Sequence, residues 1–463
     1  MAQQQRGSFS SRLGFIAAAA GSAVGLGNIW KFPYETGLNG GAAFLVIYLF
    51  CVFIICMPIL VAEITVGRHA RQNPHGSYKK IGGGNWGVIG TIGIIVGIMI
   101  LSFYNVVAGW AFGYFLQTSF GDLLSKGDFA SYFGKYTANV TDNLIFSLAF
   151  MVATGLIVAG GVQKGIERWT KILMPVLLVI VLGLIVYGLT LPNAREGVSF
   201  YLVPDFSEVE AGTFFSALSQ AFFSLSLGMG AIITYGSYFN KEDNIVSSAA
   251  LVTTTDSLIA FLSGLLVFPL VFFQAQEPTE GPGLVFVALP GIFEQMGPMI
   301  GPLIGGTFFL LLCFAALTST ISLLEVPVAY VTDEFNVKRK PAVIGIASLI
   351  FLLGLPSMLA HGAVDWFTNF ATYGGETHNF MTVLITIFSD IGLPFGGFMI
   401  SIFVAYKWGM KRFADEIEHG HPHFRGRIEE KFVTVMLSFI SPLVVGTILI
   451  ITVLQSFFGI QVF

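Results

Sequence analysis

The chain has 463 residues, of which 54% are hydrophobic and only 11% are charged, with a formal net charge of −4. Soluble domains carry about 25% charged residues, so this composition excludes an ordinary soluble enzyme and indicates a protein that crosses a lipid bilayer many times. Lys and Arg form no basic tail of the kind that binds nucleic acid, so no nucleic-acid partner is expected. The three cysteines lie inside apolar segments and imply no disulfide framework.

Apolar segments long enough to cross the bilayer recur along the whole chain. A spanning helix needs about 20 predominantly apolar residues, and this criterion predicts eleven spans. Their expected limits are 11–36, 41–66, 87–119, 143–160, 168–191, 213–239, 244–273, 301–332, 341–359, 379–407 and 432–457.

The positions of Lys and Arg predict the orientation of the chain, because cytoplasmic loops are enriched in these residues. If the N-terminus is cytoplasmic, all but four of the 23 Lys and Arg residues lie on the inner side. The exceptions are Lys31, Lys126, Lys135 and Arg195. We therefore expect a multi-pass protein of the plasma membrane with a cytoplasmic N-terminus and an extracellular C-terminus.

Two of the predicted spans are interrupted by small residues. Residues 21–28 of the first span contain three glycines, and residues 224–230 of the sixth contain two glycines and two serines. Each glycine weakens a helix by about 1 kcal/mol relative to alanine. Backbone groups freed in this way need other partners inside a membrane. Interrupted helices at matching positions in two halves of a chain point to the binding site of a secondary transporter.

The spans form two sets of five, each of which begins with an interrupted helix. The first set covers 11–191 and the second covers 213–407, and an odd number of crossings inverts the second set relative to the first. We therefore predict an all-α transmembrane domain over 1–463, built as a 5+5 inverted repeat, with 432–457 as an extra helix. The outer loop 274–300 contains an apolar run that is expected to fold back onto the bundle.

Sequence motifs of several other protein classes are missing. The chain contains neither a Walker A pattern nor a zinc-protease pattern, so an ATP-driven pump, a metalloprotease and enzyme activity in general are poor interpretations. A continuous pore usually shows a ring of charged side chains, and the sequence contains no evident ring of this kind. At each interrupted helix, one half-helix presents unpaired N–H groups that suit a carboxylate, and the other presents carbonyls that suit an ammonium group or Na+. A zwitterionic amino acid matches both.

Several motifs carry a family resemblance. They are Gly25-Leu26-Gly27-Asn28-Ile29-Trp30-Lys31-Phe32-Pro33, Gln220-Ala221-Phe222-Phe223-Ser224-Leu225-Ser226-Leu227-Gly228, Lys164-Gly165-Ile166-Glu167-Arg168 and Ala315-Ala316-Leu317-Thr318-Ser319. Together they resemble the neurotransmitter:sodium symporter family, and the eleven-span form looks like its bacterial amino-acid branch. The resemblance implies a LeuT-type fold with interrupted helices 1 and 6 and Na+-coupled symport by alternating access.

The resemblance also implies a substrate site at the two interruptions. The carboxylate would be held by the N–H groups of Leu26 and Gly27 and by the Tyr104 hydroxyl. The amine would be held by carbonyls of Ala23, Phe223 and Ser224 and by the Ser226 hydroxyl. The substrate side chain would meet Ser22, Ile100, Phe223, Met229, Ser319 and Leu323. This mostly apolar set favours a neutral L-amino acid that is hydrophobic or aromatic, and the flexible thioether of Met229 suits varied shapes.

Two Na+ sites follow from the same resemblance, with oxygen ligands as expected for a hard cation. The first would use Ala23, Asn28, Ser224, Asp256 and the substrate carboxylate. The second would use Gly21, Val24, Ala315, Thr318 and Ser319. Many relatives have Asn at the position of Asp256. Because Asp256 would supply a negative charge that chloride supplies in many animal members, we expect transport that is independent of chloride.

The resemblance further implies two gates and a brace. Arg6 and Asp333 would form a cytoplasmic ion pair, flanked by Phe9 and Tyr238. On the outside, Lys31 is basic as in the family, but Ile385 and Thr386 occupy the positions of its usual acidic partner. Asp390, one turn deeper, is the candidate partner of Lys31 in the outer gate. Glu63 resembles a glutamate that braces the interrupted helices.

Three alternatives remain at this point. They are a H+-coupled amine or nucleobase transporter of the same fold, a non-transporting sensor, and a channel. Asn28 and the pair Thr318-Ser319 favour Na+ over H+. The sequence leaves open which amino acid is bound, the Na+ stoichiometry and whether the protein is an oligomer.

Overall fold

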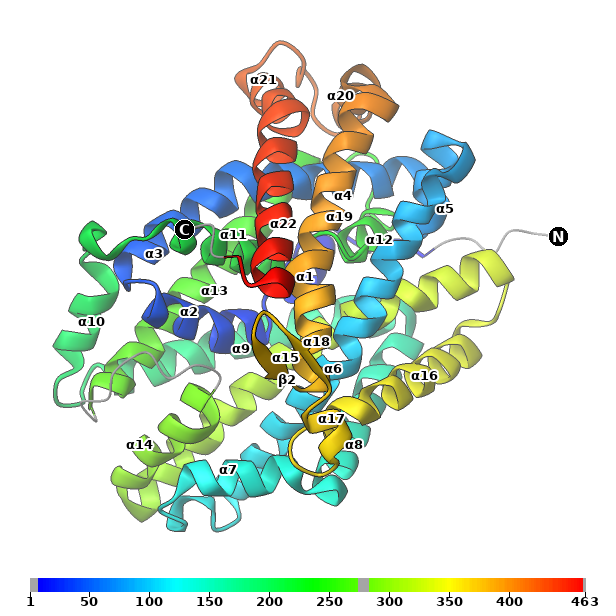
Figure 1. Ribbon diagram of the computed structural model, residues 1–463. Coiled ribbons are helices and arrows are strands. Elements are labelled where there is room, and N and C mark those ends of the chain that lie inside the picture. The colour runs from blue at the N-terminus through cyan, green and yellow to red at the C-terminus, as the bar shows by residue number, and fades with distance from the viewer. Residues whose placement is uncertain (1–6, 274–282, 461–463) are drawn as a thin grey trace.

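The computed structural model describes residues 7–273 and 283–460, which are almost entirely helical (Figure 1). The first half contains α1 Arg12–Ala23, η1 Gly27–Lys31, α2 Phe32–Leu38, α3 Ala42–Phe50, η2 Cys51–Cys56, α4 Met57–Ala70, α5 Pro74–Gly82, η3 Gly84–Trp86, α6 Gly87–Ser119, η4 Leu123–Ser125, α7 Phe129–Ala138, α8 Val140–Ala159, η5 Val162–Glu167, α9 Arg168–Gly188, α10 Ala194–Leu202 and η6 Phe206–Glu208.

The second half contains one short antiparallel hairpin besides its helices. Its elements are α11 Ala211–Ser224, α12 Ala231–Gly236, α13 Ile245–Phe273, η7 Leu284–Ala288, α14 Leu289–Gln295, α15 Gly297–Phe335, α16 Arg339–Leu359, α17 Asp365–Thr368, β1 Ala371–Tyr373, β2 Glu376–His378, α18 Phe380–Leu384, η8 Ile385–Ile391, α19 Gly392–Ile402, η9 Phe403–Gly409, α20 Met410–Glu418, α21 Ile428–Val435, η10 Met436–Ile440 and α22 Ser441–Phe458.

The membrane-spanning helices correspond to most of the predicted spans. Within the described residues, nine helices are long and apolar enough to cross a bilayer, and the bent pair Arg12–Ala23 with Gly27–Leu38 raises the number to ten. The predicted span 213–239 is divided between α11, with 14 residues, and α12, with 6 residues, and neither is long enough alone. The all-α architecture agrees with the prediction, and the number of eleven spans remains a prediction.

The first interruption lies between α1 and η1, where the chain bends by 50°. The helix ends because Val24 adopts an extended backbone with φ −72° and ψ 103°. The Val24 N–H still donates to the Ala20 carbonyl at 2.7 Å, but Gly25 lies outside the regular helix. The Gly25 N–H donates to Asn28 Oδ1 at 3.0 Å, and the Leu26 N–H donates to the Tyr104 hydroxyl of α6 at 2.8 Å.

The second interruption follows α11 and depends on left-handed backbone. Ser226, Gly228 and Gly230 have φ of 55°, 83° and 78°. A left-handed conformation costs a non-glycine residue roughly 1–2 kcal/mol, and such strain is typical of functional sites. At Gly228 a side chain is also excluded by space, because an added Cβ would collide with the Leu393 carbonyl.

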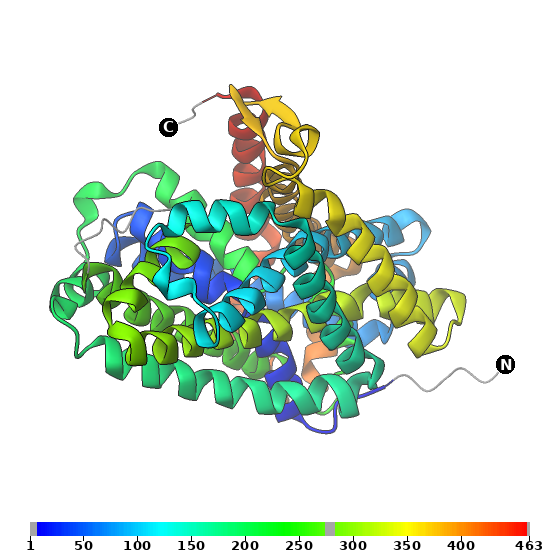
Figure 2. The ribbon, with the colours of Figure 1, turned by 90° about the horizontal axis from the view of Figure 1, so that it is seen from below.

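A glycine-lined stretch of α6 lets the second interruption lie close to the centre of the bundle. An added Cβ at Gly93 would come within 3.2 Å of the Gly228 carbonyl, and one at Gly97 within 3.5 Å of the Met229 carbonyl. Small residues of this kind permit close approach of backbones in membrane helices. α6 also packs along α15. The hairpin of β1 and β2 lies beside the end of α22 (Figure 2).

The described part of the loop 274–300, which is predicted to lie on the outer side, folds back onto the bundle as expected. Phe286 in η7 is buried and stacks on Phe133 with ring centroids 5.4 Å apart. Its ring also lies 6.4 Å from that of Trp30, next to the first interruption. Residues 274–282 of this loop lie outside the described residues.

Candidate functional site

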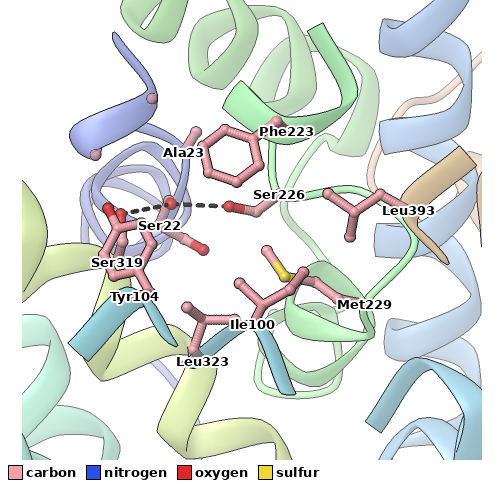
Figure 3. Close-up of a pocket in the computed structure, with 12 residues that line it drawn as sticks. Ser22, Ala23, Ile100, Tyr104, Phe223, Ser226, Met229, Ser319, Leu323 and Leu393 are labelled. Carbon is pink, nitrogen blue, oxygen red and sulfur yellow. Dashed lines mark hydrogen bonds between the residues drawn. The ribbon is translucent and has the colours of Figure 1, made fainter. Parts of the chain in front are cut away.

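The two interruptions meet at a pocket between α1, η1, α6, α11, α15 and α19 (Figure 3). The residues that line it are Ser22, Ala23, Gly25, Gly27, Ile100, Tyr104, Phe223, Ser226, Met229, Ser319, Leu323 and Leu393. None of these side chains carries a formal charge. The pocket can therefore take a ligand whose charges are satisfied by backbone groups and hydroxyls.

One wall of the pocket is polar. The Tyr104 hydroxyl accepts the Leu26 N–H at 2.8 Å, which places a phenolic O–H beside the end of the broken helix. The Ser22 carbonyl accepts hydrogen bonds from Ser226 Oγ at 2.9 Å and Ser319 Oγ at 3.2 Å. These contacts tie both interruptions to α6 and α15 (Figure 3). The strained Ser226 is thus held in place by its own side chain.

The remaining walls are apolar. The Phe223 ring covers one end of the pocket, and Ile100, Leu323 and Met229 lie at the other (Figure 3). An added Cβ at Gly27 would approach the Phe223 ring to 2.8 Å, so this glycine lets the ring lie against the backbone.

Most residues predicted for the substrate line this pocket, but two do not. Leu26 and Ser224 are not among the lining residues. The Leu26 N–H donates to the Tyr104 hydroxyl, and the Ser224 hydroxyl donates to the Asp256 carboxylate. The sequence interpretation missed Gly25 and Leu393. Gly25 belongs to the motif at 25–33, and a glycine there could have indicated a pocket residue. An added Cβ at Gly25 would lie 2.7 Å from Tyr104 Oη, so only glycine leaves this space open.

Two of the residues predicted for a first Na+ site, Asn28 and Ser224, contact Asp256, whose side chain is fully buried, and the third, Ala23, lines the central pocket. Ser224 Oγ donates to the carboxylate at 2.9 Å and Asn28 Nδ2 donates to it at 2.7 Å. Among the described residues, no basic side chain forms an ion pair with Asp256. A buried carboxylate without a cationic partner is costly, so the cluster has the negative charge and the oxygen atoms that a bound Na+ requires.

A second oxygen cluster lies where α1 meets α15. Thr318 Oγ1 donates to the Ala315 carbonyl at 2.9 Å and lies 3.1 Å from the Val24 carbonyl. Gly21 lies next to Thr318, since an added Cβ there would be in van der Waals contact with Thr318 Cβ at 3.5 Å. Ser319 is predicted for the same Na+ site and for the substrate site. It lines the pocket, and its hydroxyl donates a hydrogen bond to the Ser22 carbonyl.

Thr318→Ala is expected to weaken Na+ binding by about tenfold to a hundredfold, because a contact to a charged group contributes about 1.5–3 kcal/mol. Thr320→Ala is the matched control, because Thr320 is equally buried on the same helix but bonds to Thr154. Na+ titrations of substrate binding measure both variants. Equal Na+ affinity in Thr318→Ala and the control would contradict this assignment.

Glu63 contacts the second interruption directly. Its Oε1 accepts the Gly228 N–H at 2.7 Å, and its side chain is buried. This bond satisfies a backbone donor that has no helical partner where the chain is irregular. The placement agrees with the bracing role expected for this residue.

On the predicted cytoplasmic side, Phe9 and Tyr238 lie together as expected. Their ring centroids are 6.2 Å apart, and the Phe9 N–H donates to the Tyr238 carbonyl at 3.1 Å. Asp333 accepts the Asn73 N–H at 2.9 Å. Arg6, its predicted partner, lies outside the described residues. A partly buried ion pair that sequence reasoning missed joins Glu325 to Arg339, and Tyr238 Oη donates to the same carboxylate at 2.8 Å.

On the opposite side of the pocket, Lys31 and Asp390 form an ion pair of 3.8 Å. The Lys31 ammonium also lies 5.1 Å from the centre of the Phe223 ring. Asp390 reaches Lys31 from η8, a π-helical segment, whose turns are wider than those of an α-helix. Partly exposed ion pairs contribute about 0–1 kcal/mol, so this contact can break at small cost.

Comparison with known proteins identifies the class. The family model described as the sodium:neurotransmitter symporter family matches residues 6–131 and 131–459. The chain is 38% identical over 423 residues to the uncharacterized sodium-dependent transporter YhdH of Bacillus subtilis (strain 168). The alignment covers 91% of this chain and 92% of YhdH. It is 28% identical over 510 residues to the sodium-dependent serotonin transporter of Drosophila melanogaster. That alignment covers 98% of this chain and 77% of the serotonin transporter.

A solved structure supports the same class. The crystal structure of MhsT in complex with L-phenylalanine matches with a TM-score of 0.88 and 43% identity, over 96% of this chain and 99% of that chain. Fold and comparisons together define a multi-pass, sodium-dependent membrane transporter, not an enzyme. The chain belongs to the sodium:neurotransmitter symporter family and has the LeuT-type fold, which confirms the predicted resemblance.

Proposed function

We propose that the protein is a Na+-coupled symporter of neutral, hydrophobic or aromatic L-amino acids. The observation that carries this proposal is the pocket at the two interruptions, which combines one polar wall with apolar walls and has no charged lining side chain. MhsT, 43% identical, is in complex with L-phenylalanine. A charged substrate side chain would find no counter-ion in this pocket, and its burial would be costly.

In this proposal the substrate backbone binds at the interrupted helices and its side chain lies among Ile100, Met229 and Leu323. The carboxylate accepts hydrogen bonds from Tyr104 Oη and from N–H groups at the start of η1, where the helix dipole favours negative charge. The amine donates to carbonyls at the ends of α1 and α11. Two Na+ ions bind, one beside Asp256 and one beside Thr318, and transport does not require chloride.

Alternating access would follow from the two interruptions, since each allows its half-helices to tilt separately. The pair Lys31–Asp390 would close the outer side, and the group around Tyr238 and Asp333 the inner side. We further propose that 11–191 and 213–407 form an inverted repeat in the plasma membrane, with the N-terminus cytoplasmic and the C-terminus extracellular.

A binding screen of the twenty common amino acids tests the substrate class. We expect thermal stabilisation of the purified protein by hydrophobic and aromatic L-amino acids in NaCl, because a ligand that binds only the folded state raises its unfolding temperature. The same amino acids in KCl serve as the control. Stabilisation by lysine or glutamate, or equal stabilisation in KCl, would contradict the proposal. Equal stabilisation in both salts combined with uptake driven by a pH gradient would favour a H+-coupled transporter.

A further inference from the structure

A second cavity lies outside the central pocket and shares no lining residue with it. It has a volume of about 360 Å3 and lies between the end of α4, the last turn of α5 and the segment from η9 into α20. Its wall includes His69, Lys80, Trp408 and Arg412. These elements belong to the face where Lys and Arg gather, from which α20 and α21 project together (Figure 1).

The two carboxylates on the cavity wall are already neutralised. Glu416 is 4% exposed and forms an ion pair of 2.8 Å with Arg68 Nε, and its other oxygen lies 2.9 Å from His69 Nδ1. Asp415 forms an ion pair with Arg425. Neither carboxylate is therefore available to balance further positive charge in the cavity.

Two cations on the same wall have no such partner. Lys80 donates to the Ala70 carbonyl at 2.9 Å, which holds the ammonium in position but leaves its charge unbalanced. Arg412 is exposed on α20. Among the described residues, neither Lys80 nor Arg412 forms an ion pair with a carboxylate. The cavity therefore carries an excess of positive charge and suits an anion.

The surroundings of the cavity indicate the depth at which this anion lies. The Trp408 indole is 4% exposed, with its ring centroid 4.9 Å from that of His69, one residue before η9 ends at Gly409. Tryptophan is enriched at the level of lipid headgroups. α5 is amphipathic, because it buries Tyr78 and exposes Lys79 and Lys80, as in helices that lie along a membrane surface.

We propose that this cavity binds the phosphate group of an anionic phospholipid headgroup, with Lys80 and Arg412 as its ligands. A phosphate diester offers acceptor oxygens to the planar guanidinium of Arg412 and to the compact charge of the Lys80 ammonium. Basic pockets between membrane helices on the cytoplasmic side bind anionic headgroups in this way. The lipid would hold α5 against α20.

Titration of the full-length protein in detergent with dioctanoyl phosphatidylglycerol, followed by native mass spectrometry, tests the proposal. The double variant Lys80→Gln with Arg412→Gln is expected to bind at least about tenfold more weakly, as for the loss of a charge-assisted hydrogen bond. Lys79→Gln with Lys411→Gln is the matched control, because it removes the same charge from the adjacent, exposed positions. Lys80→Arg with Arg412→Lys keeps both charges and should retain binding.

Three outcomes would overturn the proposal. The first is equal binding of dioctanoyl phosphatidylcholine, which would show that the acyl chains and not the charge are recognised. The second is displacement of phosphatidylglycerol by an equal concentration of inorganic phosphate, which would show a site for free anions. The third is an equal loss in the control double variant, which would show nonspecific attraction. Thermal unfolding of every variant distinguishes lost binding from lost folding.

Discussion

Replacing Asp256 with asparagine is expected to make Na+-driven uptake strongly dependent on chloride, whereas wild-type uptake should be the same in chloride and gluconate. The Asp256 carboxylate is fully buried, contacts Asn28 and Ser224, and has no ion-pair partner among the described residues. Its charge therefore remains to balance a cation in a site where uncompensated charge is costly. Asparagine keeps the shape of the side chain and removes that charge.

The measurement is uptake of radiolabelled substrate into proteoliposomes, with gluconate replacing chloride on both sides. Asp365→Asn is the control, because it makes the same chemical change at an exposed position in α17. We expect Asp256→Asn to lose most of its uptake in gluconate, with Na+ affinity reduced by about tenfold or more, as for the loss of a contact to a charged group. Chloride-dependent uptake by the wild type, or an Asp256→Asn variant that behaves as the wild type in both media, would refute this role.

Gly25→Ala is expected to abolish substrate binding while leaving the fold intact. The added methyl group would lie 2.7 Å from Tyr104 Oη and would also meet the Ser319 hydroxyl. The serine can rotate away, but the ring of Tyr104 is fixed by its bond to the Leu26 N–H. The methyl group would therefore occupy the space beside the proposed carboxylate position. Its effect should exceed that of Tyr104→Phe, which removes one hydrogen bond of about 0.5–1.5 kcal/mol.

Gly183→Ala is the matched control for this variant, because an added Cβ there meets no atom within 4 Å. Isothermal titration with L-phenylalanine in NaCl compares the variants. Thermal unfolding should show that Gly25→Ala folds as the wild type does. Retained affinity in Gly25→Ala would place the substrate carboxylate elsewhere.

The position of the site could be predicted from the sequence because its cause is local. Glycines at 25 and 27 and at 228 and 230 interrupt two apolar spans. Where a helix breaks inside a membrane, its freed N–H and C=O groups need other hydrogen-bond partners or a ligand. The same glycines explain the close contacts of the structure, such as Gly27 with the Phe223 ring. Tyr104 and Ser319 could be predicted only through the family resemblance, since neither belongs to an interruption.

Features that depend on the packing of distant helices could not be predicted in this way. The sequence named Asp390 as the candidate partner of Lys31, one turn deeper than the usual acidic position, and the two side chains do form an ion pair of 3.8 Å. The π-helical form of 385–391, which carries Asp390, could not be predicted. Leu393 joins the pocket because α19 lies against the second interruption, where Gly228 meets its backbone. The ion pair between Glu325 and Arg339 depends on how α16 folds back against α15, although the two helices follow each other in the chain.

Uptake of L-phenylalanine into proteoliposomes under an inward Na+ gradient is the most direct test of Na+-coupled amino-acid symport. We predict accumulation above the external concentration when Na+ is present only outside, and loss of accumulation when K+ replaces Na+ or when the gradient is dissipated. An excess of unlabelled hydrophobic amino acid should compete, and lysine should not. Na+-dependent binding in the thermal-shift screen without any accumulation would indicate a sensor. Accumulation that persists in K+ would contradict coupling to sodium.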